Sequence, residues 1–129
     1  MMIHMMVLDT SFLFSLFHPL DVNHAKALEI FEKHRNEEML ITDSILFETL
    51  TVLNRKLGMD AARAAYEQLL SNSRLQVHYL TEDQRKENLS EFLKQKGRLS
   101  TADISVMQAC KTALAEPLAF DKDLLRQIG

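Results

Sequence analysis

The sequence has few of the residues that cross-link, bend or interrupt a chain. Of its 129 residues, one is cysteine, two are proline and three are glycine. The single cysteine, Cys110, cannot form an internal disulfide, which excludes a disulfide scaffold and indicates a reducing compartment. The scarcity of glycine and proline leaves little material for long loops. With 47% hydrophobic and 26% charged residues, the composition is typical of a globular protein, and the length suits one domain, residues 1–129.

Long hydrophobic segments are also missing. No stretch reaches the roughly 18 consecutive apolar residues of a membrane-spanning helix. The N-terminal run to Phe17 is apolar, but it lacks the positively charged start of a signal peptide and is interrupted by Asp9. We therefore expect a cytoplasmic protein with no membrane partner.

Two common functional motifs are absent as well. No pair of the five histidines has the four-residue spacing of a helical zinc site, so the histidines are expected to be structural or solvated. No glycine-rich phosphate-binding loop is present. Cys110 falls on an apolar helix stripe, which favours a buried, unreactive thiol over a nucleophile.

Short apolar runs alternate with helical patterns along the chain. Strands are expected at 3–8, 38–42, 75–80 and 117–120, and helices at 10–17, 21–35, 43–57, 60–72, 81–97 and 100–115, with a short helical tail after residue 123. This alternation predicts an α/β fold with a central, mostly parallel sheet of four to five strands flanked by helices. Ligands of such folds bind at the carboxyl ends of the strands.

Helix ends and helix faces follow from capping residues and apolar spacing. Asp21 is expected to cap the second helix, and Asp43 or Ser44 the third. Thr81 and Ser100 are each followed three residues later by a polar partner, which predicts two capping boxes. The expected core stripes are Ala25, Leu28 and Phe31 on the second helix, and Leu46, Leu50, Leu53 and Leu57 on the third.

Four acidic residues stand where such a fold brings side chains together. Asp9 and Asp121 directly follow predicted strands, Asp103 lies on the apolar face of its helix, and Glu48 lies off the leucine stripe of its helix. Carboxylates gathered at one edge of a sheet repel each other unless a cation lies between them. A site made of carboxylate oxygens suits Mg²⁺ or Mn²⁺ rather than Zn²⁺.

Each acid also has a purely structural interpretation. Asp9 can cap the helix that follows it, and Asp103 can serve only its capping box. Asp121 can be a turn residue, and Glu48 can be a solvated helix residue. Only the four positions together favour a metal site.

Four segments carry a family resemblance. They are the apolar run Met5–Leu8 leading into Asp9, Thr10 and Ser11, the helix start at 44–48, the stretch 99–107, and the closing segment 120–124. In this order they resemble the motifs of PIN-domain ribonucleases, and most closely those of the VapC-type toxins of bacterial and archaeal toxin–antitoxin pairs. The resemblance covers almost the whole chain and is most specific in its first and last segments.

The resemblance implies a PIN-like nuclease domain over residues 1–129 and a metal-dependent endoribonuclease, the toxin of a VapBC-type module. It implies that four catalytic acids hold one or two Mg²⁺ or Mn²⁺ ions, namely Asp9, Glu48, Asp103 and Asp121. Thr10 or Ser11 would support the site through a hydroxyl, and Asp123 is a weaker candidate. Basic residues near the third and fourth motifs are candidate RNA contacts, although the pattern favours a solvated surface position for each: Lys94, Lys96, Arg98, Lys122 and Arg126.

The same resemblance implies partners. Family members commonly form homodimers and bind a small antitoxin protein. The densely apolar segment with Phe12, Phe14, Leu16 and Phe17 cannot bury every side chain on one side of a helix. Most of it is expected in the core, and an exposed remainder would suit a dimer interface or an antitoxin groove.

One position departs from the family pattern and keeps alternatives open. Ala119 stands where the family often has a threonine or serine that helps bind metal-bound water or phosphate. The chain could therefore be a catalytically weakened PIN-like module that binds RNA or protein, or a stand-alone PIN-domain nuclease that processes RNA. A phosphotransfer domain is disfavoured, because Ser11 stands where dehalogenase-like enzymes carry a second aspartate.

The net charge of −3 is unevenly distributed. Residues 1–50 hold three basic and eight acidic residues, whereas residues 51–129 hold twelve basic and ten acidic residues. Setting aside the four proposed metal ligands changes −3 to +1. The acidic total therefore does not exclude RNA, but it predicts weak non-specific affinity with modest salt sensitivity.

Overall fold

A four-stranded parallel sheet forms the centre of the protein in a computed structural model that describes residues 5–113 and 116–120. The strands are β1 (Met5–Leu8), β2 (Glu38–Thr42), β3 (Leu75–His78) and β4 (Glu116–Leu118). Their order is β3-β2-β1-β4, and each neighbouring pair is parallel. The predicted fold class is confirmed.

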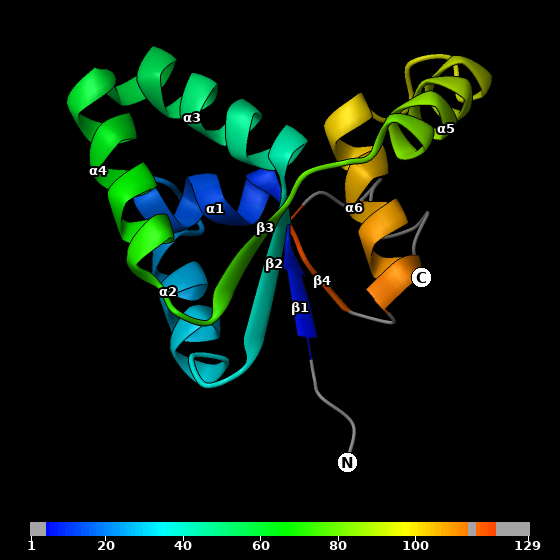
Figure 1. The fold of residues 1–129 in the computed structure, drawn as a ribbon. Coiled ribbons are helices and arrows are strands. Elements are labelled where there is room, and N and C mark those ends of the chain that lie inside the picture. The colour runs from blue at the N-terminus through cyan, green and yellow to red at the C-terminus, as the bar shows by residue number, and fades with distance from the viewer. Residues whose placement is uncertain (1–4, 114–115, 121–129) are drawn as a thin grey trace.

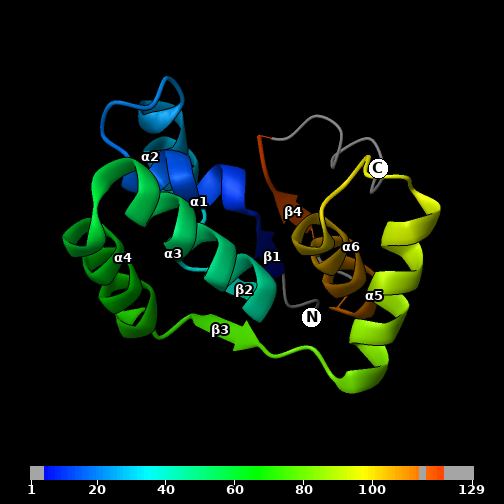
Figure 2. The same ribbon diagram turned by 90° about the horizontal axis from the view of Figure 1, so that it is seen from above.

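Helices cover both faces of this sheet (Figure 1). They are α1 (Thr10–Phe17), α2 (His24–Lys33), α3 (Asp43–Leu57), α4 (Met59–Ser71), α5 (Glu82–Lys94) and α6 (Thr101–Ala113). Viewed from above, α1 to α4 lie on one side and α5 and α6 on the other (Figure 2). Strands covered on both faces need continuous apolar runs, as in the buried residues Met6 to Leu8 and Met39 to Ile41. Within the described ranges, no helix is long and apolar enough to cross a membrane.

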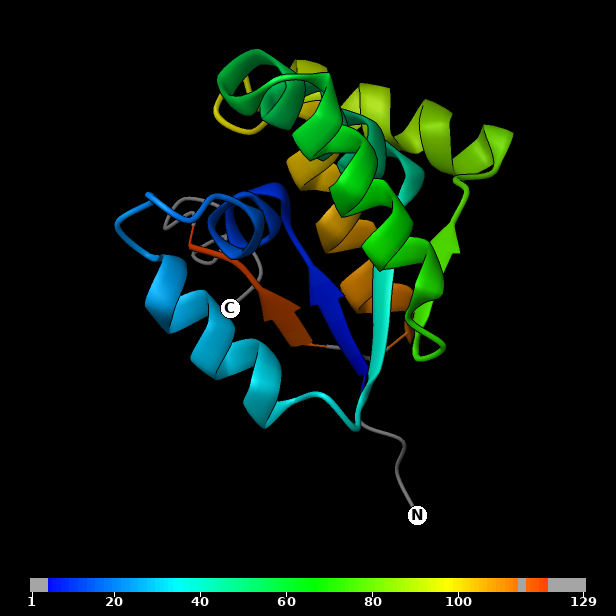
Figure 3. The ribbon, with the colours of Figure 1, turned by 90° about the vertical axis from the view of Figure 1, so that its left-hand side faces the viewer.

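The carboxyl ends of the four strands point the same way (Figure 3). After β1 the chain moves to β2 on one side, while the late strand β4 pairs with β1 on the other. The carboxyl end of β1 is therefore the switch point of the sheet, the place where open parallel sheets usually bind ligands.

Several predicted helix ends are confirmed. Thr81 and Gln84 form the capping box of α5 in both directions. Ser100 and Asp103 do the same before α6, at 3.2 and 3.0 Å. Gly58 follows the last residue of α3 with a φ of 97°, a backbone conformation that favours glycine.

Two predicted caps are wrong. Asp21 does not cap α2, which begins after Asn23, because the Asp21 carboxylate accepts hydrogen bonds from the Ser15 hydroxyl and the Asn23 backbone N–H. The cap of α3 is Thr42 rather than Asp43 or Ser44. On α3 the neighbouring Thr42 hydroxyl caps the helix, whereas on α2 the cap position Asn23 makes no side-chain hydrogen bond to the helix.

Element lengths and core stripes differ in detail from the prediction. β3 ends at His78, two residues early, and β4 begins at Glu116 and ends at Leu118. On α2 the buried residue is Ala27, while Ala25 and Leu28 are exposed. On α3 Leu57, the last residue of the helix, is 37% exposed. The predicted helical tail after residue 123 lies outside the described residues.

Candidate active site

Asp9 lies at the switch point, directly after β1, and is 1% exposed. It caps α1: its Oδ2 accepts hydrogen bonds from the Ser11 backbone N–H at 3.2 Å and the Ser11 hydroxyl at 2.9 Å. Its Oδ1 is buried and has no hydrogen-bond partner among the described residues. Capping therefore accounts for one oxygen of Asp9 and leaves the other available.

Burial raises the pKa of Asp9 to about 6, and the charge of Asp103 acts in the same direction. The hydrogen bonds from Ser11 and the backbone lower it, but less strongly. A buried carboxylate that ionises with difficulty and retains a free oxygen is suited to bind a cation, because a cation stabilises the charged form.

A hydrogen bond from α1 holds the side chain of Glu48 near Asp9. The hydroxyl of Thr10 donates a hydrogen bond to Glu48 Oε2 at 2.6 Å, which joins α1 to α3. Glu48 is half-buried and bonded to a residue of another helix, so it is more than a freely solvated helix residue.

An open cavity of about 350 Å³ joins these groups to α6. Its lining residues come from the start of α1, the middle of α3 and the start of α6, and they are Asp9, Thr10, Ser11, Phe14, Glu48, Val52, Ser100 and Asp103. Asp103 takes part in its capping box and also faces this cavity. Three of the four predicted acids thus share one pocket.

A buried hydroxyl pair fixes the two helices that carry Glu48 and Asp103. Thr42 Oγ1 lies 2.6 Å from Ser105 Oγ, and both residues are completely buried. Thr42 Oγ1 also accepts the Ile45 N–H, and Ser105 Oγ donates to the Ala102 carbonyl. Each hydroxyl then donates once and accepts once, in a chain that ties the start of α3 to the first turns of α6.

Comparison with known proteins identifies the family. The family model described as the PIN domain matches residues 6–129. The chain belongs to the PIN-domain family. A solved structure similar to this PIN domain is the Mycobacterium tuberculosis toxin VapC20, described as cleaving the sarcin–ricin loop. The two are 25% identical with a TM-score of 0.86, over 95% of this chain and 94% of that one. No curated protein matches the chain by sequence.

Several predicted site residues of the PIN domain lie outside the described residues. They are Asp121, Lys122, Asp123 and Arg126. The last described residue before them, Phe120, is fastened beside the pocket: its N–H donates to the Ser11 hydroxyl at 2.7 Å, and its ring stacks on Phe12 with centroids 5.9 Å apart. Ser11 thus contacts both Asp9 and the segment that leads into the fourth motif.

The predicted basic contacts that are described lie together between α5 and α6. Lys94 ends α5, Lys96 adopts a φ of 53° in the turn that follows, and Arg98 comes two residues before Ser100. All three are exposed, and none of them lines the cavity.

In the described part of the chain, no three histidine, cysteine, aspartate or glutamate side chains already lie close enough to hold a metal ion. The histidines form no site there, and Cys110 is buried, which raises the pKa of its thiol to about 11. The burial of Cys110 and its raised pKa are consistent with the expected unreactive thiol.

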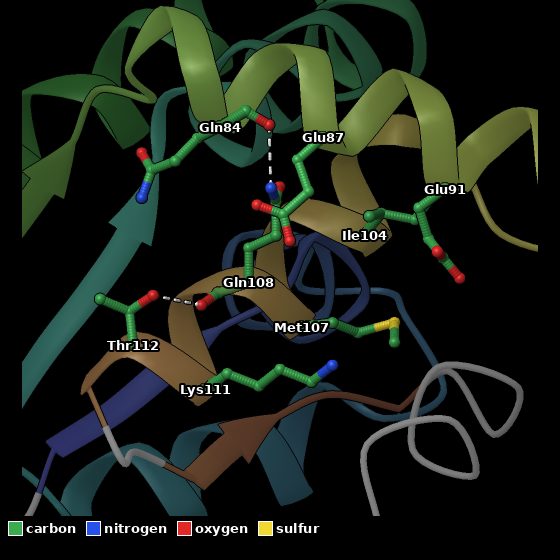
Figure 4. Close-up of a pocket in the computed structure, with 8 residues that line it drawn as sticks. All are labelled: Gln84, Glu87, Glu91, Ile104, Met107, Gln108, Lys111 and Thr112. Atoms are coloured by element: carbon green, nitrogen blue, oxygen red, sulfur yellow. Dashed lines mark hydrogen bonds between the residues drawn. The ribbon is translucent and has the colours of Figure 1, made fainter.

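A second hollow, of about 180 Å³, lies between α5 and α6 and does not contain the predicted acids (Figure 4). Its side chains fasten the two helices together. Gln108 Nε2 donates to the Gln84 carbonyl at 2.9 Å, and Asn88 Nδ2 donates to Gln108 Oε1 at 2.9 Å. This hollow supports the placement of α6 rather than the candidate chemistry.

Sequence reasoning missed four residues of this region: Thr42, Ser105, Phe14 and Val52. A threonine directly before a helix is a good cap, so Thr42 could have been found. Phe14 and Val52 follow Thr10 and Glu48 by four residues, the spacing that places side chains on the same helix face. Ser105 gives no local signal, because its partner is 63 residues away.

Proposed function

We propose that this PIN domain is a metal-dependent endoribonuclease of the VapC toxin type, which hydrolyses RNA phosphodiester bonds. Membership of the PIN family and the similarity to VapC20, described as a toxin that cleaves the sarcin–ricin loop, support an RNA substrate. The observation that carries the proposal is the buried, unpartnered Oδ1 of Asp9, in a pocket shared with Glu48 and Asp103.

The donor set fits a hard divalent cation. Asp9, Glu48 and Asp103 offer carboxylate oxygens only, the ligands that Mg²⁺ and Mn²⁺ prefer. Mg²⁺ commonly keeps several water ligands and binds only one or two carboxylates directly, so three carboxylates in direct contact are not required. Asp121 is proposed as the fourth acid on the resemblance alone. When bound, such an ion lowers the pKa of water and offsets charge on the phosphodiester.

The chain's own residues have distinct tasks in this proposal. Asp9 is the fixed anchor, because the Ser11 hydroxyl and N–H hold one of its oxygens and leave the other for the cation. Thr10 orients Glu48 through the 2.6 Å hydrogen bond. The Thr42–Ser105 pair maintains the separation of α3 and α6, and thereby of Glu48 and Asp103.

The deciding experiment compares two matched aspartates. Asp21, like Asp9, accepts hydrogen bonds from a serine hydroxyl and from a backbone N–H two residues ahead, but it does not line the pocket. We expect Asp9→Asn to abolish Mg²⁺- or Mn²⁺-dependent cleavage of a panel of structured RNAs. Asp21→Asn should cleave at the wild-type rate, because Asp21 lies outside the pocket and bonds only to Ser15 and to the turn before α2.

Three results would contradict the proposal. Cleavage by Asp9→Asn equal to that of wild type would point to a contaminating nuclease. If wild type and Asp9→Asn bound Mn²⁺ with equal affinity, measured by calorimetry, Asp9 would not be a metal ligand. A chain that binds RNA and never cleaves it would instead favour a binding module.

Partners follow from the same proposal. We propose a cognate antitoxin protein and a homodimer, since the family resemblance implies both. Cytoplasmic location and the assignment of residues 1–129 to one domain stay predictions. Co-expression with a small protein encoded beside this gene, followed by mass measurement of the purified complex, tests both partners together.

A further inference from the structure

The pocket has an apolar layer directly beside its acidic layer. Phe14 follows Thr10 by four residues on α1, and Val52 follows Glu48 by four residues on α3. Each apolar side chain therefore lies one helical turn, about 5.4 Å, beyond its polar neighbour on the same helix face. All four line the same cavity.

Phe14 is held in a defined orientation. Its ring packs against the small core cluster of Leu53, Ala62 and Ala65. On another side, His18 meets the ring edge-to-face, with centroids 5.1 Å apart and planes at 88°. Phe14 remains partly exposed, and among the described residues that line the cavity it is the only aromatic one.

A fixed aromatic ring one turn away from the carboxylates proposed to hold the metal, and with it the scissile phosphate, suits a nucleotide. The base of a nucleotide lies a few ångströms from its own phosphate, so a phosphate at the acidic layer brings a neighbouring base to the apolar layer. Proteins that recognise single-stranded RNA stack unpaired bases on aromatic side chains in this manner.

We propose that Phe14 is a stacking platform for an unpaired base next to the scissile phosphate, with Val52 as the opposite wall of the slot. The proposal rests on the proposed ribonuclease function and specifies its substrate: RNA with an unstacked nucleotide at the cleavage position, as in a loop, rather than a continuous duplex. Phe14 is then a specificity-determining residue, not a catalytic one.

Phe17 supplies a matched control. It packs against the same Leu53, Ala62 and Ala65 cluster, but it faces a different cavity, between α1, α2 and α4, and does not line the acidic pocket. Phe14→Leu and Phe17→Leu therefore remove an aromatic ring from the same cluster. Only the first removes it from the pocket, and Phe14→Tyr restores a stacking ring.

The test combines these variants with abasic RNA. A short single-stranded RNA that wild type cleaves at one position is also prepared with an abasic residue on either side of that position. On intact RNA we expect Phe14→Leu to lower kcat/KM about tenfold, within the range of base–aromatic stacking, while Phe17→Leu and Phe14→Tyr stay within about twofold of wild type. One of the two abasic RNAs lacks the base that Phe14 would stack on, and Phe14→Leu and wild type should cleave that RNA at equal rates.

A second arm measures binding without cleavage. Fluorescence anisotropy measures binding in an Asp9→Asn background. There Phe14→Leu should weaken binding of the intact RNA about tenfold, and should not change binding of the abasic RNA that lacks the stacked base. Equal losses on intact and abasic RNA, or the same loss with Phe17→Leu, would overturn the platform. If wild type cleaves no RNA, the proposed function itself fails; if wild type cleaves and Phe14→Leu cleaves and binds intact RNA equally well, only the platform proposal fails.

Discussion

At the scale of single residues, Asp9 combines a structural task with an energetic cost. Its pKa rises from 3.8 to about 6 because it is buried, next to Asp103. Between these two values the folded chain holds a proton that the unfolded chain has lost. The contribution of Asp9 to stability therefore falls as pH rises through this range, and it stays unfavourable above about pH 6.

Replacing this carboxylate by its neutral isostere removes that cost. In metal-free protein at pH 8, we expect Asp9→Asn to raise the free energy of unfolding by about 1–3 kcal/mol, since each pKa unit corresponds to roughly 1.4 kcal/mol. The gain should shrink toward pH 4. Urea denaturation in the presence of a chelator at both pH values measures it.

The sign of this effect distinguishes a carboxylate suited to bind a cation from a carboxylate with a purely structural role. Asp21, whose pKa is lowered by the Ser15 hydroxyl and the Asn23 N–H, supplies the contrast. Asp21→Asn should not stabilise the protein at pH 8. An Asp9→Asn protein that is less stable than wild type at pH 8 would contradict the burial argument.

At the scale of elements, the joint between α3 and α6 determines whether two acids meet. Thr42→Val removes the cap of α3 and leaves the Ile45 N–H and the Ser105 hydroxyl with one partner fewer. We expect a loss of about 2 kcal/mol in the free energy of unfolding, measured by urea denaturation. Thr42→Ser keeps the hydroxyl and should lose less.

The same joint predicts that its two residues are coupled. Ser105→Ala breaks the bond that Thr42→Val also breaks, so the double variant should lose less than the sum of the single losses. Strict additivity would show that the two hydroxyls act separately.

Most elements of this fold are predictable because their signals are local. The β2 boundaries, both capping boxes and the stop at Gly58 need only neighbouring residues. Two of the errors arise where a contact with α1 decides: Asp21 accepts a hydrogen bond from Ser15, and the inner face of α2 is set by its packing on α1. Likewise, the sequence predicts that Asp9, Glu48 and Asp103 converge, but the Thr10–Glu48 bond depends on how α1 and α3 cross.

At the scale of the whole molecule, the net charge of −3 does not attract RNA, so binding must depend on local basic contacts. The turn with Lys94, Lys96 and Arg98 supplies three exposed cations just before α6. Replacing all three by alanine in an Asp9→Asn background should weaken RNA binding and reduce the slope of log affinity against log salt by about 2, if each contacts one phosphate. Anisotropy titrations at several salt concentrations measure the slope.

The control for this prediction lies on α2 and its end. Lys26 and Lys33 on α2 and Arg35 just after it are also exposed, and none of the three lines the acidic pocket. Their replacement by alanine should leave the salt slope nearly unchanged. Equal losses in both triple variants would indicate a diffuse electrostatic attraction.

Because β4 pairs with β1, the sheet can be completed only late in synthesis of the chain. A ribosome makes β1 first, but the strand that covers its free edge, and the Phe120 N–H that reaches Ser11, are made only after α6. At the usual rates of synthesis this interval is on the order of ten seconds. During that interval the nascent chain has Asp9 without its last neighbouring strand, and a chain terminated before residue 116 never completes the sheet. If the chain is the nuclease proposed, its activity would then begin only after the ribosome has translated the final strand of the sheet.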